Sequence, residues 1–422
     1  MMLLLGLCIL LSNQRRSINW RLVAGGVILQ VLLAVLILAT PFGGVVEWMS
    51  GGFVKLLGFS DVGAEFMFGE LINASRYGFA FKVLPTILFV AALTSLLYYL
   101  GVLQWIVFGF AWIMKRLMHL SGAESLAAAA NIFVGQTEAP LVVKPYINSM
   151  TKSELMALMT GGMATIAGSV FGLYVVTLGR DDPEVKIAVA RQLLTASMMN
   201  APAALLVAKM LVPEREQIDE DLLVPRDNAG RNALDALARG TTEGLKLALN
   251  VAAMLIVFVA VIALLNAIFS WFGSMGGGAD GGLIDNLVIK ASGGVFPGLS
   301  LEAVLGFIFA PVALAIGAEW GDVLQLGQLL GTRMVANEFV AYLQLGEIKL
   351  AGELSPKSVF LATFALCGFA NFSSIGIQIG GIGALAPERR SDLAALGFKA
   401  MIGGTIASLL TASVAGIFYG LS

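Results

Sequence analysis

Charged residues are scarce in this chain, and their scarcity decides its class. Only 13% of the 422 residues are Asp, Glu, Lys or Arg, whereas 58% are hydrophobic, and the mean hydropathy is +0.87. A soluble domain of this size needs a far more polar surface, so the chain is predicted to lie in a lipid bilayer. The formal net charge of −2 argues against nucleic-acid binding, which requires a basic surface.

Cysteine and histidine are almost absent. Cys8 and Cys367 lie in apolar runs without CxxC spacing, which excludes a disulfide scaffold and a thiolate metal site. His119 is the only histidine, so neither a zinc site nor a pair of haem ligands can form. We expect His119 to lie at an interface and not to be a proton site. A membrane-embedded enzyme is also disfavoured, because no nucleophile–base pair or cofactor motif is present.

Eight apolar runs predict membrane-spanning helices, at about residues 2–12, 22–40, 82–101, 153–178, 186–212, 243–272, 358–382 and 395–420. The first run is short for a span, so we expect that it is incomplete or begins upstream. Its positive residues follow the apolar core, which is not the order of a signal peptide. Basic residues then recur in alternate connections: Arg15, Arg16 and Arg21; Lys115, Arg116, Lys144 and Lys152; Arg215, Arg226, Arg231 and Arg239; Arg389, Arg390 and Lys399. The positive-inside rule makes these connections cytoplasmic and predicts both termini outside.

Two segments, 121–150 and 318–350, are too polar for ordinary spans and too apolar for free loops. Each has two apolar arms and a polar tip, so we interpret both as re-entrant helical hairpins. Residues 82–212 and 243–422 contain the same order of elements: a span, a further apolar piece, a hairpin and two more spans. The two series start from opposite sides of the membrane. The predicted fold is therefore an all-α integral membrane protein with about eight transmembrane helices, two re-entrant hairpins and an inverted-topology repeat. Residues 1–81 would form N-terminal spans and an interfacial segment, and 213–242 a charged cytoplasmic linker.

Each hairpin tip carries a glutamate, Glu138 in the first and Glu338 in the second. A carboxylate inside a membrane costs about 2.5–3.5 kcal/mol even on the lenient insertion scale, so its presence favours a binding role. The alternative is that each glutamate pairs with a structural donor such as Arg333 or lies at a water interface. Gln136 and Thr137 add an amide and a hydroxyl that suit a nucleobase edge, or else they cap helix ends.

Polar and small residues also lie in the middle of two predicted spans. Thr165 and Gly168 in one, and Asn371 and Gly376 in the other, mark places where a helix can open and offer carbonyls to a cation. The alternative is close packing of small residues, which we prefer for Ser169 and Ser373. Asn371 and Ser374 lie on one helical face and are better ligand candidates. Phe369 would stack on a base or serve only in packing.

Three strings together resemble the concentrative nucleoside transporters. They are Gly135-Gln-Thr-Glu-Ala-Pro140, Asn337-Glu-Phe-Val-Ala-Tyr342 and Gly368-Phe-Ala-Asn-Phe-Ser-Ser-Ile-Gly376. The likeness extends from about Leu10 to the end, and the short N-terminus is similar to the bacterial form. The resemblance implies a homotrimer in the bacterial inner membrane, with a scaffold domain and a mobile transport domain.

The resemblance also implies a site. The base would contact Gln136, Thr137, Glu138 and Val170, and the ribose would contact Glu338, Phe369, Asn371 and Ser374. Sodium would bind Asn131 and Thr165 with backbone oxygens of Val134 and Ile166, a neutral oxygen cage that suits a hard monovalent ion. The expected function is import of a uridine-like nucleoside with sodium as coupling ion, by alternating access and without another cofactor. A proton-coupled transporter is the main alternative, and a channel is another.

Overall fold

The computed structural model describes residues 1–73, 78–180, 182–218, 231–275 and 282–420. Within these ranges all regular structure is helical, which confirms the predicted all-α class. The α-helices are α1 (Met2–Leu11), α2 (Trp20–Leu38), α3 (Gly43–Phe68), α4 (Gly78–Tyr99), α5 (Val102–Met118), α6 (Gly122–Ala130), α7 (Ala139–Val142), α8 (Lys152–Ala164), α9 (Gly168–Gly179), α10 (Pro183–Leu211), α11 (Ala233–Gly273), α12 (Leu283–Ala291), α13 (Leu301–Ala315), α14 (Val323–Val335), α15 (Glu338–Ala351), α16 (Pro356–Ala365), α17 (Phe372–Leu385) and α18 (Arg390–Ile417). Short 3-10 turns lie at Arg15–Ser17, Gly69–Asn73, Lys144–Tyr146, Trp320–Asp322 and Pro387–Arg389.

Five described segments are long and apolar enough to cross a membrane: Trp20–Leu38, Lys152–Gly179, Pro183–Leu211, Ala233–Gly273 and Pro387–Ile417. The pair Leu84–Tyr99 and Val102–Met118, bent by 75°, would make a sixth. The first predicted run forms the ten-residue helix α1, and the seventh is divided between α16 and α17. The count of eight spans therefore stays a prediction.

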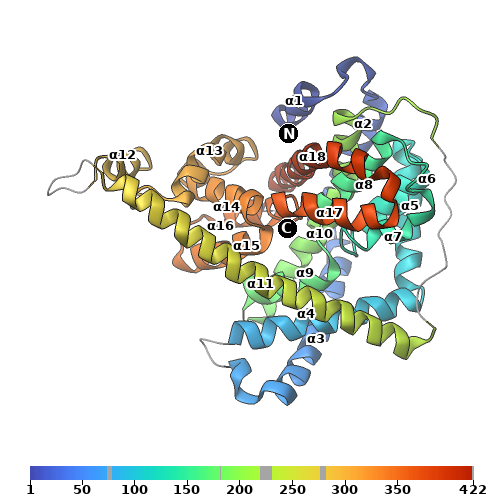
Figure 1. The fold of residues 1–422 in the computed structure, drawn as a ribbon, viewed down its shortest axis with the longest axis horizontal. Helices are drawn as coiled ribbons and strands as arrows, with labels where there is room; N and C mark the ends of the chain where they lie inside the picture. The colour runs from blue at the N-terminus through green and yellow to red at the C-terminus, as the bar shows by residue number, and fades with distance from the viewer. Residues whose placement is uncertain (74–77, 181, 219–230, 276–281, 421–422) are drawn as a thin grey trace.

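The helix α10 lies at the core of the molecule, packed against α2, α8 and α18 (Figure 1). Its C-terminal half is rich in alanine and fully buried, for example at Ala203 and Ala204. Small residues let the neighbouring helices approach closely: a Cβ at Gly404 of α18 would lie 2.8 Å from Met163 of α8. This dense centre supports the irregular segments around it.

Two predicted spans are broken at mid-length, and the breaks contain Thr165 and Asn371, whereas Gly168 and Gly376 lie within the helices that follow. Residues 165–167 separate α8 from α9, and residues 366–371 separate α16 from α17. The two predicted hairpin segments each form two helical arms around a non-helical tip, α6 and α7 around 131–138 and α14 and α15 around 336–337. Their depth in a membrane stays a prediction.

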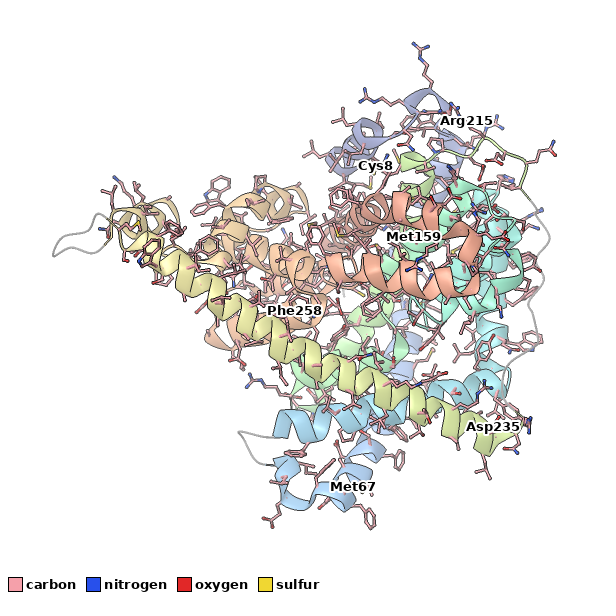
Figure 2. The ribbon with its side chains drawn as sticks, in the orientation of Figure 1. Cys8, Met67, Met159, Arg215, Asp235 and Phe258 are labelled. Atoms are coloured by element: carbon pink, nitrogen blue, oxygen red, sulfur yellow. The ribbon has the colours of Figure 1, made fainter. Side chains whose placement is uncertain are left out.

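The helix α11 is longer than the sequence predicted, and it runs obliquely across the view in Figure 1. It begins at Ala233, inside the predicted linker 213–242, because the Asn232 side chain caps it by accepting from Asp235 N at 2.8 Å. Figure 2 labels Asp235 near this end and Phe258 in the middle of the helix. Gly240 and Gly244 let α11 pack against Ala91 of α4. Linker residues 219–230 lie outside the described residues.

Candidate substrate and cation site

A cavity of about 870 Å³ lies against the tips of both hairpins. Its lining includes every residue predicted to bind the substrate: Gln136, Thr137, Glu138, Val170, Glu338, Phe369, Asn371 and Ser374. The helices α4 and α11 contribute further lining, including Ser95 and Asn250. Pockets for small ligands commonly measure roughly 300–1,000 Å³, so this one has room for a nucleoside.

The Glu338 carboxylate is held by two neutral donors. The Tyr174 hydroxyl donates to Oε1 at 2.8 Å, and Asn371 Nδ2 donates to Oε2 at 3.0 Å. Glu338 is the first residue of α15, where the helix dipole favours a negative charge. Its side chain is 5% exposed, so the carboxylate is both buried and fixed in orientation. The alternative for this glutamate was a hydrogen-bonded pair with Arg333. The structure does not show that pair, because Arg333 donates to backbone carbonyls and to a serine hydroxyl instead.

Asn371 also organises the start of α17. Its Oδ1 accepts from Ser374 N at 2.9 Å and from the Ser373 hydroxyl at 2.7 Å. These bonds fix the amide so that its Nδ2 faces Glu338. The Asn371 side chain therefore caps α17 and orients the Glu338 carboxylate at the same time, so capping and ligand positioning are not exclusive here.

A chain of amides joins hairpin one to α17. Gln136 Nε2 donates to Ser374 Oγ at 3.1 Å, and Gln378 Nε2 donates to Gln136 Oε1 at 3.1 Å and to Met159 O at 3.0 Å. Figure 2 labels Met159 close to the ribbon of α17. The sequence analysis did not single out Gln378, although it follows Ser374 by four residues and so lies on the same helical face. This chain places the Gln136 amide at the edge of the cavity.

Hairpin one keeps its glutamate half-buried. Gly135 N donates to Glu138 Oε2 at 3.1 Å, which folds the carboxylate back over the tip. Thr137 is exposed and lines the cavity next to it. Glu138 and Thr137 thus both line the cavity, one with a carboxylate-bearing and the other with a hydroxyl-bearing side chain. Val170 and Phe369 supply apolar lining.

The four residues predicted to bind sodium lie where hairpin one meets the break between α8 and α9. Asn131 is 1% exposed, and both its amide atoms lack a hydrogen-bond partner among the described residues. A Cβ at Gly161 would lie 3.2 Å from Asn131 Nδ2, which places the amide against the last turn of α8.

Thr165, in the break itself, donates from Oγ1 to Gly161 O at 2.9 Å, so the lone pairs of the hydroxyl oxygen are free to accept or to bind a cation. Phe133 O accepts from Gly168 N at 3.0 Å and fixes the tip to the break, beside Val134 and Ile166. A buried amide without a hydrogen-bond partner, lying beside a break in a helix, fits a monovalent cation.

Asn200 of α10 joins the two breaks, and the sequence analysis missed it. Its Nδ2 donates to Ala164 O at 2.7 Å and to Cys367 O at 2.9 Å. Tyr174 was missed as well, although it follows Val170 by four residues on α9. His119, in contrast, is an exposed residue that ends α5, and it is not among the residues lining the cavity.

Three family models match the chain in succession. Residues 1–71 and 192–416 match the N-terminus and C-terminus of the Na+ dependent nucleoside transporters, and residues 80–181 match a domain described as nucleoside recognition. The chain belongs to the family of concentrative, Na+ dependent nucleoside transporters. Members of this family are transporters and not enzymes, as expected from the sequence.

Relatives match the chain over its whole length. An uncharacterized transporter of Haemophilus influenzae is 44% identical and covers 100% of this chain and 97% of its own. Solute carrier family 28 member 3 of Mus musculus is 41% identical over 97% of this chain, and sodium/nucleoside cotransporter 1 of Rattus norvegicus is 39% identical over 98%. The chain spans 57% and 63% of these two mammalian proteins.

Solved structures of the transporter CNTnw share the fold. One in an inward-facing substrate-bound state has a TM-score of 0.86 at 38% identity, covering 99% of this chain and 97% of that chain. A variant in an outward-facing state has a TM-score of 0.89 at 38% identity, covering 100% of this chain and 97% of that chain. The likeness over the full chain confirms the membrane transporter fold that the motifs implied.

Proposed function

We propose that this transporter imports nucleosides together with sodium ions, and that Glu338 is the main ligand of the ribose. The observation that supports this most is the Glu338 carboxylate, buried at the cavity and held by Tyr174 and Asn371. Both of these direct donors are neutral, so the carboxylate remains a strong acceptor, and hydroxyl groups of a sugar would be favourable partners. Ser374 and Phe369 would complete the ribose side, and Gln136, Thr137, Glu138 and Val170 the base side.

Sodium would couple to the nucleoside through hairpin one. Asn131, Thr165 and the carbonyls of Val134 and Ile166 would hold the ion, and the same tip carries Gln136 and Glu138. An ion that fixes this tip raises nucleoside affinity by binding better to the substrate-competent state. The reciprocal effect, tighter sodium binding with nucleoside present, follows by linkage.

Transport would proceed by alternating access. CNTnw has been solved in inward-facing, intermediate and outward-facing states, and this chain is similar to all of them. We assign 1–81 to a scaffold, 82–212 and 243–422 to inverted repeats and 213–242 to the connection between them. Both termini would lie on the outer, non-cytoplasmic side of the bacterial inner membrane. The exposed apolar face of α11, including Ile256 and Leu264, fits contact with lipid or with neighbours in a homotrimer.

Uptake of radiolabelled uridine into proteoliposomes tests this proposal. We expect accumulation with an inward sodium gradient, none with an equal potassium gradient, and competition by adenosine if purines share the site. Glu338→Gln should abolish uptake, while Glu347→Gln, in the same helix at an exposed surface pair with Arg180, should leave it unchanged. Uptake that persists without sodium and collapses with a protonophore would instead select the proton-coupled alternative.

A further inference from the structure

Two half-helices end inside the protein, α8 at Ala164 and α16 at Ala365, and both residues are fully buried. The last carbonyl groups of a helix lack donors within the helix, and the helix dipole concentrates partial negative charge there. Both ends therefore need donors or a positive charge. At the end of α8, Asn200 donates to Ala164 O. The sodium ion proposed above would bind near the remaining carbonyl groups of that helix end.

At the second end a cation is already part of the chain. Arg333, in the last turn of α14, is 1% exposed. Its Nη1 donates to Ala365 O at 2.5 Å and to Ser408 Oγ at 2.7 Å, and its Nε donates to Gly368 O at 3.3 Å. Nη2 has no hydrogen-bond partner among the described residues. The guanidinium thus joins hairpin two to the break between α16 and α17. Asn131 has the corresponding position in the first repeat, between hairpin one and the break between α8 and α9.

Hydrogen bonding alone does not explain an arginine at this position. The groups that accept hydrogen bonds from Arg333 are all neutral, and a neutral amide can serve such carbonyls, as Asn200 does for Ala164 and Cys367. Burying a guanidinium is costly, and Glu338 attracts it only through charge, without a direct hydrogen bond. What Arg333 adds is a permanent positive charge at a helix C-terminus, five positions before Glu338 in the chain.

We propose that the Arg333 guanidinium is a built-in cation that takes, in the second repeat, the place of the dissociable sodium in the first. Hairpin two is then always joined to α16 and α17, and only hairpin one needs an ion to dock. Each nucleoside accordingly binds with one dissociable sodium ion. This inference rests on the proposed sodium coupling.

The test compares three variants of the full-length protein. Arg333→Lys keeps the charge, Arg333→Asn replaces it with an amide like that of Asn131, and Arg333→Met removes both charge and polar groups. Uridine binding is measured at a series of NaCl concentrations, with choline chloride keeping the ionic strength constant. At sodium concentrations well below saturation, the slope of log affinity against log sodium concentration gives the number of ions that bind with uridine.

We expect a slope of about one for the wild type and Arg333→Lys, and a slope rising toward two for Arg333→Asn, because a second ion enters the vacated place. Arg333→Asn with wild-type affinity and slope would overturn the proposal. If that variant does not fold, the other two decide. Binding kept by Arg333→Lys and weakened at least tenfold in Arg333→Met supports a required cation, and equal binding refutes it. A wild-type slope of zero would reject the sodium coupling of the proposed function. The comparison of Arg333→Lys with Arg333→Met would then still test whether a positive charge is required at position 333.

Discussion

The main chain of Gly368 passes so close to Ala164 that a Cβ at position 368 would lie 2.5 Å from the Ala164 carbonyl oxygen. Gly368 also has a φ of +144°, which glycine adopts readily and other L-residues avoid. The breaks of the two discontinuous helices therefore meet backbone against backbone. This contact, together with the two hydrogen bonds of Asn200, joins the break beside the proposed cation site to the break that precedes Asn371.

Replacing Gly368 with alanine should disrupt this crossing. The added methyl group cannot be accommodated without moving main chain, and the backbone conformation itself becomes strained by about 1–3 kcal/mol. We expect a lower thermal unfolding temperature of the purified transporter and loss of uridine binding.

Gly376→Ala is the matched control, since it lies in the same motif but has no atom within 4 Å of a Cβ. In a helix this change stabilises by roughly 0.5–1 kcal/mol where space permits. Equal thermal stability and uridine binding in the two variants would contradict the proposed role of the crossing.

Removing the Tyr174 hydroxyl should weaken nucleoside binding without unfolding the protein. Hydrogen bonds to charged groups contribute about 1.5–3 kcal/mol, so Tyr174→Phe should raise the KM for uridine roughly 10- to 100-fold. Uptake kinetics in proteoliposomes give this value. The reason is that Glu338 loses one of the two donors that orient it.

Tyr342→Phe provides an internal comparison. The two rings lie 4.7 Å apart and both are buried, but the Tyr342 hydroxyl donates to Thr363 O at 2.8 Å instead of to a carboxylate. This variant should lose stability and keep its KM. A similar rise in KM for both variants would point to general disturbance of the core and not to the orientation of Glu338.

The sequence predicts those site residues that stand out from their neighbours in the chain, and it misses those whose role depends on a distant partner. Glu138 and Glu338 stand out because a carboxylate in an apolar segment is costly, and the hairpin tips are visible as polar interruptions. Tyr174 contacts Glu338 across 164 positions of sequence, and Gln378 contacts Gln136 across 242. Such partners depend on how the broken helices pack, which no local period encodes. Asn200 is hidden for the same reason.

The start of α11 shows a different limit. The sequence 233–242 contains several charged and polar residues and was assigned to the linker by composition. The signal for a helix was nevertheless present, with Asn232 as N-cap and Asp235 in the first turn. Hydropathy identifies the part of a helix that lies in lipid, so a helix that extends beyond the membrane is predicted too short.

Asn131 should account for the effect of sodium on stability. A ligand that binds only the folded state stabilises it, by about 2.7 kcal/mol at one hundred times its Kd. We expect NaCl, but not KCl, to raise the unfolding temperature of the wild type, and Asn131→Leu to remove the difference. Gln30→Leu is a suitable control, because Gln30 is also a buried amide but donates to Thr411 at 2.8 Å. A sodium effect that survives in Asn131→Leu would place the ion elsewhere.

Acid should weaken the contact between α10 and the segment that follows it. Glu214 accepts from Lys209 Nζ at 3.0 Å and from Thr151 Oγ1 at 2.8 Å, and Lys209 also contacts the buried Glu124 at 2.8 Å. Burial alone would raise the pKa of Glu214, but the charge of Lys209 and the hydrogen bonds outweigh it, and the pKa lies below the usual 4.5. A carboxylate with a depressed pKa in the folded state contributes stability above its unfolded pKa and loses it as the pH falls through the folded value.

The unfolding temperature should therefore decline as the pH is lowered from about 5 through the unfolded pKa and below. Glu214→Gln should start from a lower unfolding temperature at neutral pH and show a shallower decline, because it has no proton to take up. Glu216→Gln, two positions along at an exposed site, should follow the wild-type profile. An identical acid profile in wild type and Glu214→Gln would show that the Lys209 contact does not control acid stability.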